Sequence, residues 1–445
     1  MAALVPRIRG FNLAVLVITP ALGLYGLCTV PFNLATTIFS AIFYVFSMLG
    51  ITAGYHRLYS HRAYSASVPI QLFLLLAGAS AVQGSALWWC RSHRSHHRYT
   101  DTPLDPYNSH RGLLYTHIGW MVLKPAPSPG SSEENPGTGS RLDGKPGRSN
   151  DSDLRNDKLV MWQHVNYFPI AFFMGYFLPC LVAGWGWGDW RGGLYFAGMV
   201  RLTLVHHCTF CVNSLAHYLG TTPYDDKLSP RDHIITAIVT LGEGHHNFHH
   251  QFPTDYRNAI KWYQWDPTKW FIWTCSKLGL AYHLKTFPSN EIKKGELTMK
   301  MKQLKQEQDS LTWHKEVADL PVVTWEHFQD QAKERTLVLI AGFIHDCTAF
   351  AQNHPGGAMI VEKSSGKDMT AAFFGGIYSH SNAAHNLLSM MRVGVLEGGV
   401  ETTHDAPPER VVANLRPEDI NIDFRVPPAR KLMIVEATKT QQDLQ

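Results

Sequence analysis

The sequence predicts a mainly α-helical membrane protein with a helical cap that carries a metal site, followed by a separate α+β domain. Three observations support this class. Hydrophobic residues make up 45% of the 445-residue chain and gather into long runs, which is typical of membrane helices. Three dense clusters of histidine lie between or just after these runs. Beyond residue 290 the composition becomes polar, and then changes again to strand-like and turn-like segments.

Four apolar runs are long enough to cross a bilayer as helices, which takes about 20 residues each. They are residues 11–30, 32–53, 167–185 and 192–212. Short connections join them into two hairpins, and each hairpin returns the chain to the side from which it came. We therefore expect four transmembrane helices, with the three histidine clusters on the N-terminal side.

A fifth apolar run, residues 68–89, is expected to re-enter the membrane or to lie along its surface. If it crossed, about 30 Å of bilayer would separate the first two histidine clusters, and they could not build one site. The histidine side also collects basic residues, whereas the turn at Pro31 has none, so the positive-inside rule makes that side cytosolic. These basic residues are Arg57, Arg62, Arg91, Arg94, Arg98, Arg111 and Lys124.

Histidine occurs 24 times in the chain, and its three clusters follow two spacings. Residues 56–61 are H-x4-H, and residues 93–97 and 246–250 are both H-x2-H-H. The H-x2-H-H spacing places imidazoles on one face of an α-helix, where they can serve one or two metals. The H-x4-H spacing does not, so we expect the helix to unwind after Ala53. Neutral imidazole suits iron, copper and zinc, and eight or nine such groups around two metals favour iron and oxygen chemistry.

Some neighbouring residues are expected to stay outside this site. The third cluster is complete without His245, and His206 and His207 lie in an apolar run where helix packing accounts for them. Glu243 and His246 form one Glu-x-x-His pair, as in the carboxylate di-iron bundles. That pattern is the weaker interpretation, because the sequence has no second copy in a comparable setting.

Composition divides the chain into four parts. Residues 1–290 form the membrane domain, with a Pro-, Gly- and Ser-rich insert at 126–157 that we expect to be flexible. Residues 291–319 are a polar helical linker, residues 320–399 form a unit of about 80 residues that is large enough to fold alone, and residues 400–445 form a tail. In the third part, His354 begins an HPGG turn, and His380 follows 26 residues later.

Several motifs together resemble one family. HRLYSHR, RSHRSHHRYTDT, NSLAH and GEGHHNFHHQFPTDYRNAIKWYQWDP are similar to the acyl-CoA Δ9 desaturases of the endoplasmic reticulum. The unit that contains HPGG is similar to cytochrome b5, and the fusion of the two resembles the fungal form of stearoyl-CoA desaturase. The resemblance covers residues 10–125, 155–290 and 320–397. It implies two non-haem irons in the membrane domain and haem b in the C-terminal domain.

The resemblance also implies a ligand set. Nine histidines would hold the two irons, and Asn213 would reach one iron through a water. The nine are His56, His61, His93, His96, His97, His217, His246, His249 and His250. His354 and His380 would be the axial haem ligands, and such bis-histidine ligation suits electron transfer because iron keeps no open position. Two positions depart from the family: His245 replaces a usual aromatic residue, and Ser92 replaces the Asp of animal members.

The activity that the resemblance implies is an O2-dependent insertion of a cis double bond at C9–C10 of palmitoyl- or stearoyl-CoA. The fused haem domain would supply electrons and an NADH-cytochrome b5 reductase would recharge it, at the endoplasmic reticulum membrane, with both termini cytosolic. Arg91 and Lys124 are expected to contact the CoA phosphates, since Arg and Lys are the usual phosphate partners. Tyr44 and Met48 share a helix stripe with His56, Met48 about 12 Å along it, and are expected to close the acyl tunnel.

Two alternatives remain open. The same histidines would serve a membrane desaturase of another regiochemistry or a fatty acyl hydroxylase. A membrane-anchored electron carrier would need only the haem domain, with the histidine clusters vestigial. The small formal net charge of +4 gives no reason to expect a nucleic acid partner. The expected partners are acyl-CoA, O2, the reductase and membrane lipid.

Overall fold

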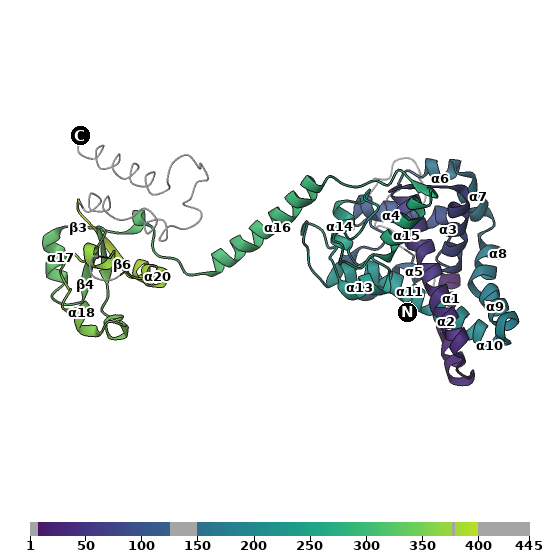
Figure 1. Cartoon of the computed structure of the whole chain (residues 1–445), viewed down its shortest axis with the longest axis horizontal. Helices are drawn as coiled ribbons and strands as arrows, with labels where there is room; N and C mark the ends of the chain where they lie inside the picture. The colour runs from purple at the N-terminus through teal and green to yellow at the C-terminus, as the bar shows by residue number, and fades with distance from the viewer. Residues whose placement is uncertain (1–7, 125–148, 376–378, 399–445) are drawn as a thin grey trace, which may run out of the picture. The chain divides into compact units, whose positions relative to one another are not determined.

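The structure, a computed structural model, describes residues 8–124, 149–375 and 379–398. The chain forms two compact units, residues 1–305 and 306–445. In the described residues the first unit is almost entirely helical, and the second contains a four-stranded sheet (Figure 1). The predicted tail, residues 400–445, lies outside the described residues.

Among the described helices of the first unit, three are long and apolar enough to cross a membrane, namely Gly10–Thr29, Leu34–Ser60 and Tyr167–Trp187. They comprise α1 (Gly10–Thr29), then α2 (Leu34–Leu49) with its continuation η2 (Gly50–Ser60), and then α8 (Tyr167–Phe172), η5 (Phe173–Phe177) and α9 (Leu178–Trp187). The fourth predicted span is also helical, through α10 (Trp190–Gly192), η6 (Gly193–Val200) and α11 (Arg201–Asn213). It contains an arginine and two histidines and is therefore less apolar. Because η6 contacts α1, α2 and α9, these segments form one bundle.

The apolar run at residues 68–89 does not form one helix. α3 (Val68–Ser80) has 13 residues, and the chain turns before α4 (Ala86–Tyr99) begins. A helix of that length measures about 20 Å, which is too short for the hydrocarbon core. The guanidinium of Arg201 links the end of α3 to η5, because it donates to the backbone oxygens of Ser80 (2.8 Å) and Gly175 (2.7 Å).

The helix that carries the first histidine cluster does not unwind after Ala53, and that prediction is wrong. The chain continues to Ser60 as the π-helix η2, whose hydrogen bonds run from residue i to i+5. Side chains bind its backbone: for example, Ser60 Oγ donates to the oxygen of Tyr55 (2.8 Å), and the Tyr64 hydroxyl donates to the oxygen of Ala53 (2.9 Å). The prediction assumed α-helical periodicity, which a π-helix does not have.

The rest of the first unit covers the histidine end of this bundle with short elements. β1 (Ser65–Ala66) pairs antiparallel with β2 (Ala281–Tyr282). The short helices are η3 (Ser109–Arg111), η4 (Tyr115–Gly119), α5 (Trp120–Val122), α6 (Ser152–Asn156), α7 (Lys158–Val165), α12 (Leu215–Tyr218), α13 (Ile234–Val239), α14 (His246–Gln251) and α15 (Pro267–Lys277).

The insert at 126–157 was predicted to be flexible, and for residues 149–157 this is wrong. This part contains α6 and is bound to α4 by ion pairs, with Arg91 2.6 Å from Asp151 and Arg94 2.7 Å from Asp153. Composition does not reveal such pairs, because they depend on which residues the fold brings together. Residues 126–148 of the insert lie outside the described residues.

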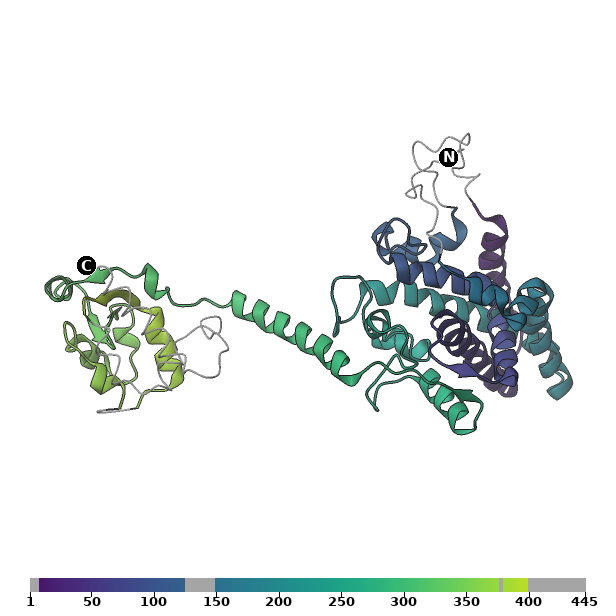
Figure 2. The ribbon, with the colours of Figure 1, turned by 90° about the horizontal axis from the view of Figure 1, so that it is seen from above.

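The predicted linker helix is present as α16 (Ser289–Ser310), a single uninterrupted helix (Figures 1 and 2). Its first half belongs to the first unit. Ile292 and Met299 are buried, Ile292 packs against Phe248 of α14, and Lys302 Nζ lies 2.5 Å from Asp226 Oδ2. The residues just after 290 are therefore part of the folded membrane domain.

The second unit contains one mixed sheet with strand order β3-β6-β5-β4. The strands are β3 (Val322–Val323), β4 (Leu337–Ile340), β5 (Phe343–Asp346) and β6 (Arg392–Leu396); β3 is parallel to β6, and the other pairs are antiparallel. Its helices are η7 (Val317–Asp319), α17 (Trp325–Gln331), η8 (Ala351–Asn353), α18 (Ala358–Glu362), α19 (Thr370–Phe373) and α20 (Asn382–Met390). Alternate residues of β4 enter separate hydrophobic clusters, with Leu337 and Leu339 in one and Val338 and Ile340 in the other.

Candidate metal centre

All nine histidines singled out in the membrane domain gather in two neighbouring groups. The first group holds His56, His61, His93, His97 and His249, and the second holds His96, His217, His246 and His250. In each group, one ring nitrogen from every member lies within 4.8 Å of the others. The predicted convergence of the three clusters is confirmed, and His245 lies outside both groups, as expected.

The π-helix explains how H-x4-H can serve one site. The amide of His61 donates to the backbone oxygen of His56 across five residues (3.1 Å), which brings the two rings to a centroid distance of 4.8 Å. In an α-helix, residues five apart point in different directions, since neighbours on one face are three or four apart. Both side chains of the first cluster therefore enter the same group.

The two H-x2-H-H helices each serve both groups. α4 sends His93 and His97 to the first group and His96 to the second, while α14 sends His249 to the first and His246 and His250 to the second. Ser85 caps α4 by accepting from the amide of Trp88 (3.3 Å), and Asp232 accepts from the amide of Asn247 (2.9 Å) at the start of α14. His217 joins the second group from α12, which follows α11 after a bend at Ser214.

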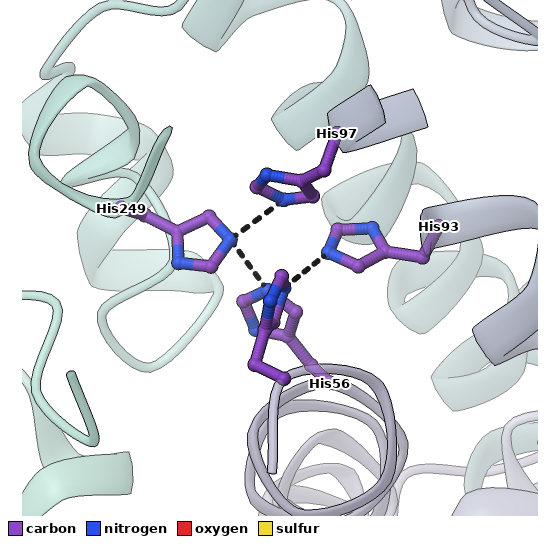
Figure 3. A group of neighbouring side chains, drawn as sticks. His56, His93, His97 and His249 are labelled. Carbon is purple, nitrogen blue, oxygen red and sulfur yellow. Dashed lines mark hydrogen bonds between the residues drawn. The ribbon is translucent and has the colours of Figure 1, made fainter. Parts of the chain in front are cut away.

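The separations between ring nitrogens fit shared metal ions. In the first group, Nε2 of His249 lies 2.9 Å from Nε2 of both His56 and His97 (Figure 3). In the second group, the corresponding separations are 3.0 Å for His217–His246 and 3.1 Å for His246–His250. One imidazole Nε2 has at most one proton, so His249 cannot donate to both neighbours. Two nitrogens bound at right angles to one metal at about 2.1 Å would lie about 3 Å apart.

Burial keeps these rings in the form that binds metals. It lowers the pKa of seven of the nine imidazoles below the usual value, and neighbouring histidines lower it further. For His217 the pKa falls to about 3. The other six are His61, His93, His97, His246, His249 and His250, each shifted well below the ordinary value. A neutral imidazole offers its lone pair to a cation, so the site suits two metal ions.

Several acidic residues around the histidines were missed as partners by the sequence analysis. Glu243 Oε2 lies 2.7 Å from His56 Nδ1, and Asp105 Oδ1 lies 2.9 Å from His96 Nδ1. His217 Nδ1 contacts Ser229 Oγ (2.7 Å), which donates to Asp101 (2.5 Å). The signal for Asp101 and Asp105 was their place just after the second cluster, in a stretch that the resemblance already included.

Glu243 does not behave as half of a Glu-x-x-His pair, so the carboxylate-bundle interpretation is wrong. It lies in neither group of candidate metal ligands. Its Oε1 accepts from Arg57, and its Oε2 accepts from Asn258. Burial favours the neutral acid, but Arg57 and His56 outweigh burial and lower the pKa of Glu243 to about 2. The side chain is therefore an anion that contacts His56 at Nδ1, the ring nitrogen opposite the one that faces the other histidines.

A cavity lies beside both groups. Its wall contains His56 and His93 of the first group and His246 of the second, with Asn213 and a largely apolar and aromatic remainder. The remaining lining residues are Met48, Ile51, Thr52, Gln83, Trp88, Trp89, Tyr107, Trp120, Met121, Thr209, Phe210, Val212, Thr240 and Glu243. Such a wall suits an apolar chain held next to the metal-binding nitrogens.

Of the residues expected to contact substrate, one lines the cavity and the others do not. Met48 lines the cavity together with Thr52 and His56. Tyr44 is not among the lining residues, and its hydroxyl donates to the backbone oxygen of Val239 (2.5 Å). Arg91 is paired with Asp151, and Lys124 is exposed at the edge of the described residues.

The second unit places its two predicted haem ligands on loops beside its helices. His354 begins the HPGG turn, in which Gly357 has a φ of 97° that favours glycine. Nδ1 of His354 is buried without a hydrogen-bond partner in the described residues. The His380 ring stacks on Phe373 with centroids 4.3 Å apart, and its Nδ1 lies 3.0 Å from the oxygen of Phe373. Another histidine of this unit, His345, is buried within β5, where burial lowers its pKa to about 3.

Fold and site together define an integral membrane protein with a histidine-rich dinuclear metal centre and a small haem-binding domain. The chain belongs to the fatty acid desaturase family: residues 31–286 match "Fatty acid desaturase", and residues 324–397 match "Cytochrome b5-like Heme/Steroid binding domain". The cofactors are accordingly a non-haem di-iron centre and haem.

Two relatives match over more than four fifths of the chain, and a third matches over a smaller part. A probable acyl-CoA desaturase of Schizosaccharomyces pombe is 52% identical over 382 residues, which covers 86% of this chain and 76% of the relative. Acyl-CoA desaturase 1 of Saccharomyces cerevisiae is 44% identical over 394 residues, covering 88% and 74%. An acyl-CoA desaturase of Ovis aries is 39% identical over 266 residues, covering 59% of this chain and 70% of the relative.

Proposed function

We propose that this protein is an acyl-CoA Δ9 desaturase that places a cis double bond at C9–C10 of palmitoyl- or stearoyl-CoA. The observation that supports this most strongly is the pair of histidine groups at the wall of an apolar cavity. Both fungal relatives carry the name acyl-CoA desaturase. In the reaction, one saturated chain, O2, two electrons and two protons give one double bond and two waters.

The nine histidines would hold the two irons, and Asn213, which lines the cavity beside His246, would reach one iron through a water. When bound, the di-iron centre supplies the O2 chemistry that removes two hydrogens from an unactivated chain. The chain's own residues supply the rest. Met48 and the aromatic wall enclose the acyl group and exclude water, and His56, His93 and His246 border that enclosure.

The C-terminal domain would supply the two electrons one at a time, with His354 and His380 as axial haem ligands, and an NADH-cytochrome b5 reductase would recharge it. A tethered carrier acts at high effective concentration. Arg91 and Lys124 would bind the CoA phosphates, and for Arg91 this requires an exchange with Asp151, its present partner. The fourth apolar segment, through η6 and α11, would complete four spans at the endoplasmic reticulum membrane, with both termini cytosolic.

Product analysis tests the activity. Cells that lack their own desaturase, expressing the full chain and fed a saturated acid, should produce the Δ9 cis acid, with the bond located by mass spectrometry. A bond at another carbon would identify a different regiochemistry. An added oxygen would identify a hydroxylase, and haem without non-haem iron in the purified protein would favour a simple electron carrier.

The position of α16 decides how the electron supply should be tested. Truncation after Lys293 would keep Ile292, which packs with Phe248, but it would remove the buried Met299 and also Lys302, which pairs with Asp226. Truncation after Ser310 keeps these contacts. We expect the chain ending at Ser310 to lose activity and to regain it when free cytochrome b5 is added, and full activity without added cytochrome b5 would contradict the proposal.

A further inference from the structure

The nine candidate ligands differ in what their Nδ1 atoms meet. Only two of them contact a carboxylate there within the described residues, and these two belong to different groups. Nδ1 of His56, in the first group, lies 2.7 Å from Glu243, and Nδ1 of His96, in the second, lies 2.9 Å from Asp105. Each metal position therefore has one histidine bound from behind by an anion.

Both carboxylates are themselves held in place. Arg57 donates to Glu243 Oε1 at 2.8 Å, and Asn258 donates to Oε2 at 2.7 Å. Asp105 accepts from the backbone amides of Asp101 (3.0 Å) and Tyr107 (2.9 Å). Each carboxylate is only 5% exposed. Asp105 is a hydrogen-bond acceptor at Nδ1 of His96, so that nitrogen carries the proton and Nε2 keeps the lone pair that a metal needs. At His56, the negative charge of Glu243, 2.7 Å from Nδ1, favours the proton on that nitrogen in the same way.

The two anions are not equivalent. Glu243 shares the cation Arg57 with Asp266, which lies 2.9 Å from the same guanidinium. Asp105 has no arginine or lysine partner among the described residues, and its ion pair is with His96 alone. Asp101 adds a second anion to this side through Ser229 and His217. The carboxylates beside the second group therefore have no arginine or lysine partner among the described residues, unlike Glu243 beside the first.

We propose that Glu243 and Asp105 are positioning residues that set the affinity of the two metal positions separately. Glu243 acts through His56 on the five-histidine group, and Asp105 acts through His96 on the four-histidine group. The proposal rests on the proposed di-iron function. It predicts that the loss of one carboxylate weakens one iron and leaves the other.

The test compares E243Q and D105N with the full-length wild type, and uses D255N as the matched control. Asp255 is equally buried and pairs with Arg257, but it contacts no imidazole in the described residues. Non-haem iron per chain and the Fe2+ dissociation constants would be measured by chelator competition, with haem counted separately. We expect one of the two irons to bind about 10–100-fold more weakly in each variant, and both to bind normally in D255N.

Mössbauer spectra of 57Fe-loaded protein would show whether the two variants affect different irons. At limiting iron, E243Q and D105N should each lose intensity from a different component of the wild-type spectrum. Retention of both irons at wild-type affinity, or the same component lost in both variants, would overturn the proposal.

Thermal stability separates positioning from a general loss of fold. A ligand raises stability in proportion to the logarithm of its concentration over its dissociation constant. A positioning residue should therefore reduce the rise in Tm on adding Fe2+, while a purely structural one should lower Tm without iron and leave the rise unchanged. The second pattern in D105N would refute the proposal, whereas a wild type without non-haem iron would refute the proposed function instead.

Discussion

Two kinds of helix present candidate metal ligands in this protein: the α-helices α4 and α14, and the π-helix η2. α4 and α14 each use i, i+3 and i+4 positions, and their side chains separate into two metal groups. η2 carries His56 and ends at its C-cap, His61; these positions lie five apart, and both histidines enter one group. Ligand spacing along a chain therefore indicates a site only together with the helix type, because 3.6 residues per turn and a wider π turn place different residues on one face.

The largest expected effect comes from removing a histidine that contacts ligands from both the π-helix and an α-helix. His249 of α14 contacts His56 of η2 and His97 of α4. We expect His249→Ala to lower turnover more than about 100-fold, beyond the usual cost of losing a residue that only supports a ligand, with less non-haem iron per chain. His245→Ala, one turn away and outside both groups, should retain both irons, and equal losses in the two variants would count against the grouping.

A second, smaller effect should distinguish the two arginines that flank the η2 histidines. Arg57 is fully buried between Glu243 and Asp266, while Arg62 is exposed and pairs with Asp153. Arg57→Met would leave two buried carboxylates without their cation and should cost about 3–5 kcal/mol of stability. Arg62→Met should cost less than about 1 kcal/mol. Thermal unfolding in detergent measures both, and similar costs would argue against the buried network.

The stripe from α2 into η2 allows a test of substrate length. Met48 lines the cavity and lies on the same helical face as His56, so Met48→Ala should shift the preferred substrates toward longer acyl chains, read from product profiles. Tyr44→Phe keeps the ring and lies outside the lining, so its profile should stay as in the wild type. A changed profile in Tyr44→Phe alone would show that the hydroxyl bond to Val239 shapes the tunnel.

The smallest expected effect concerns the bonds that hold η2 in its π form. Tyr64→Phe removes the hydroxyl that donates to the oxygen of Ala53, and a single hydrogen bond contributes about 1 kcal/mol. Tyr282→Phe, at an exposed position, is the control and should be neutral. A loss of iron in Tyr64→Phe far out of proportion to the loss of stability would mean that this bond sets ligand geometry as well.

Much of the site could be predicted because its chemistry is local in sequence. Four imidazoles within 245–250, and two more clusters with short spacings, are unusual for a packed core and predicted a metal site, whereas the set of nine candidate ligands came from the family resemblance. The run at residues 68–89 does not form one long helix, since α3 is only 13 residues long, and its place relative to the membrane stays a prediction. The three long apolar helices were visible from hydrophobicity alone.

What the sequence by itself determined is the inventory: the apolar helices, the three histidine clusters and the HPGG turn, all of which follow from residue type and short-range spacing. Only the tertiary structure decided the π form of η2, the division of the imidazoles into five and four, and the anions Glu243 and Asp105 behind two of them. The physical reason is distance along the chain. His56 meets Glu243 and His249 across more than 180 residues, and such contacts depend on how helices pack, which no local pattern records.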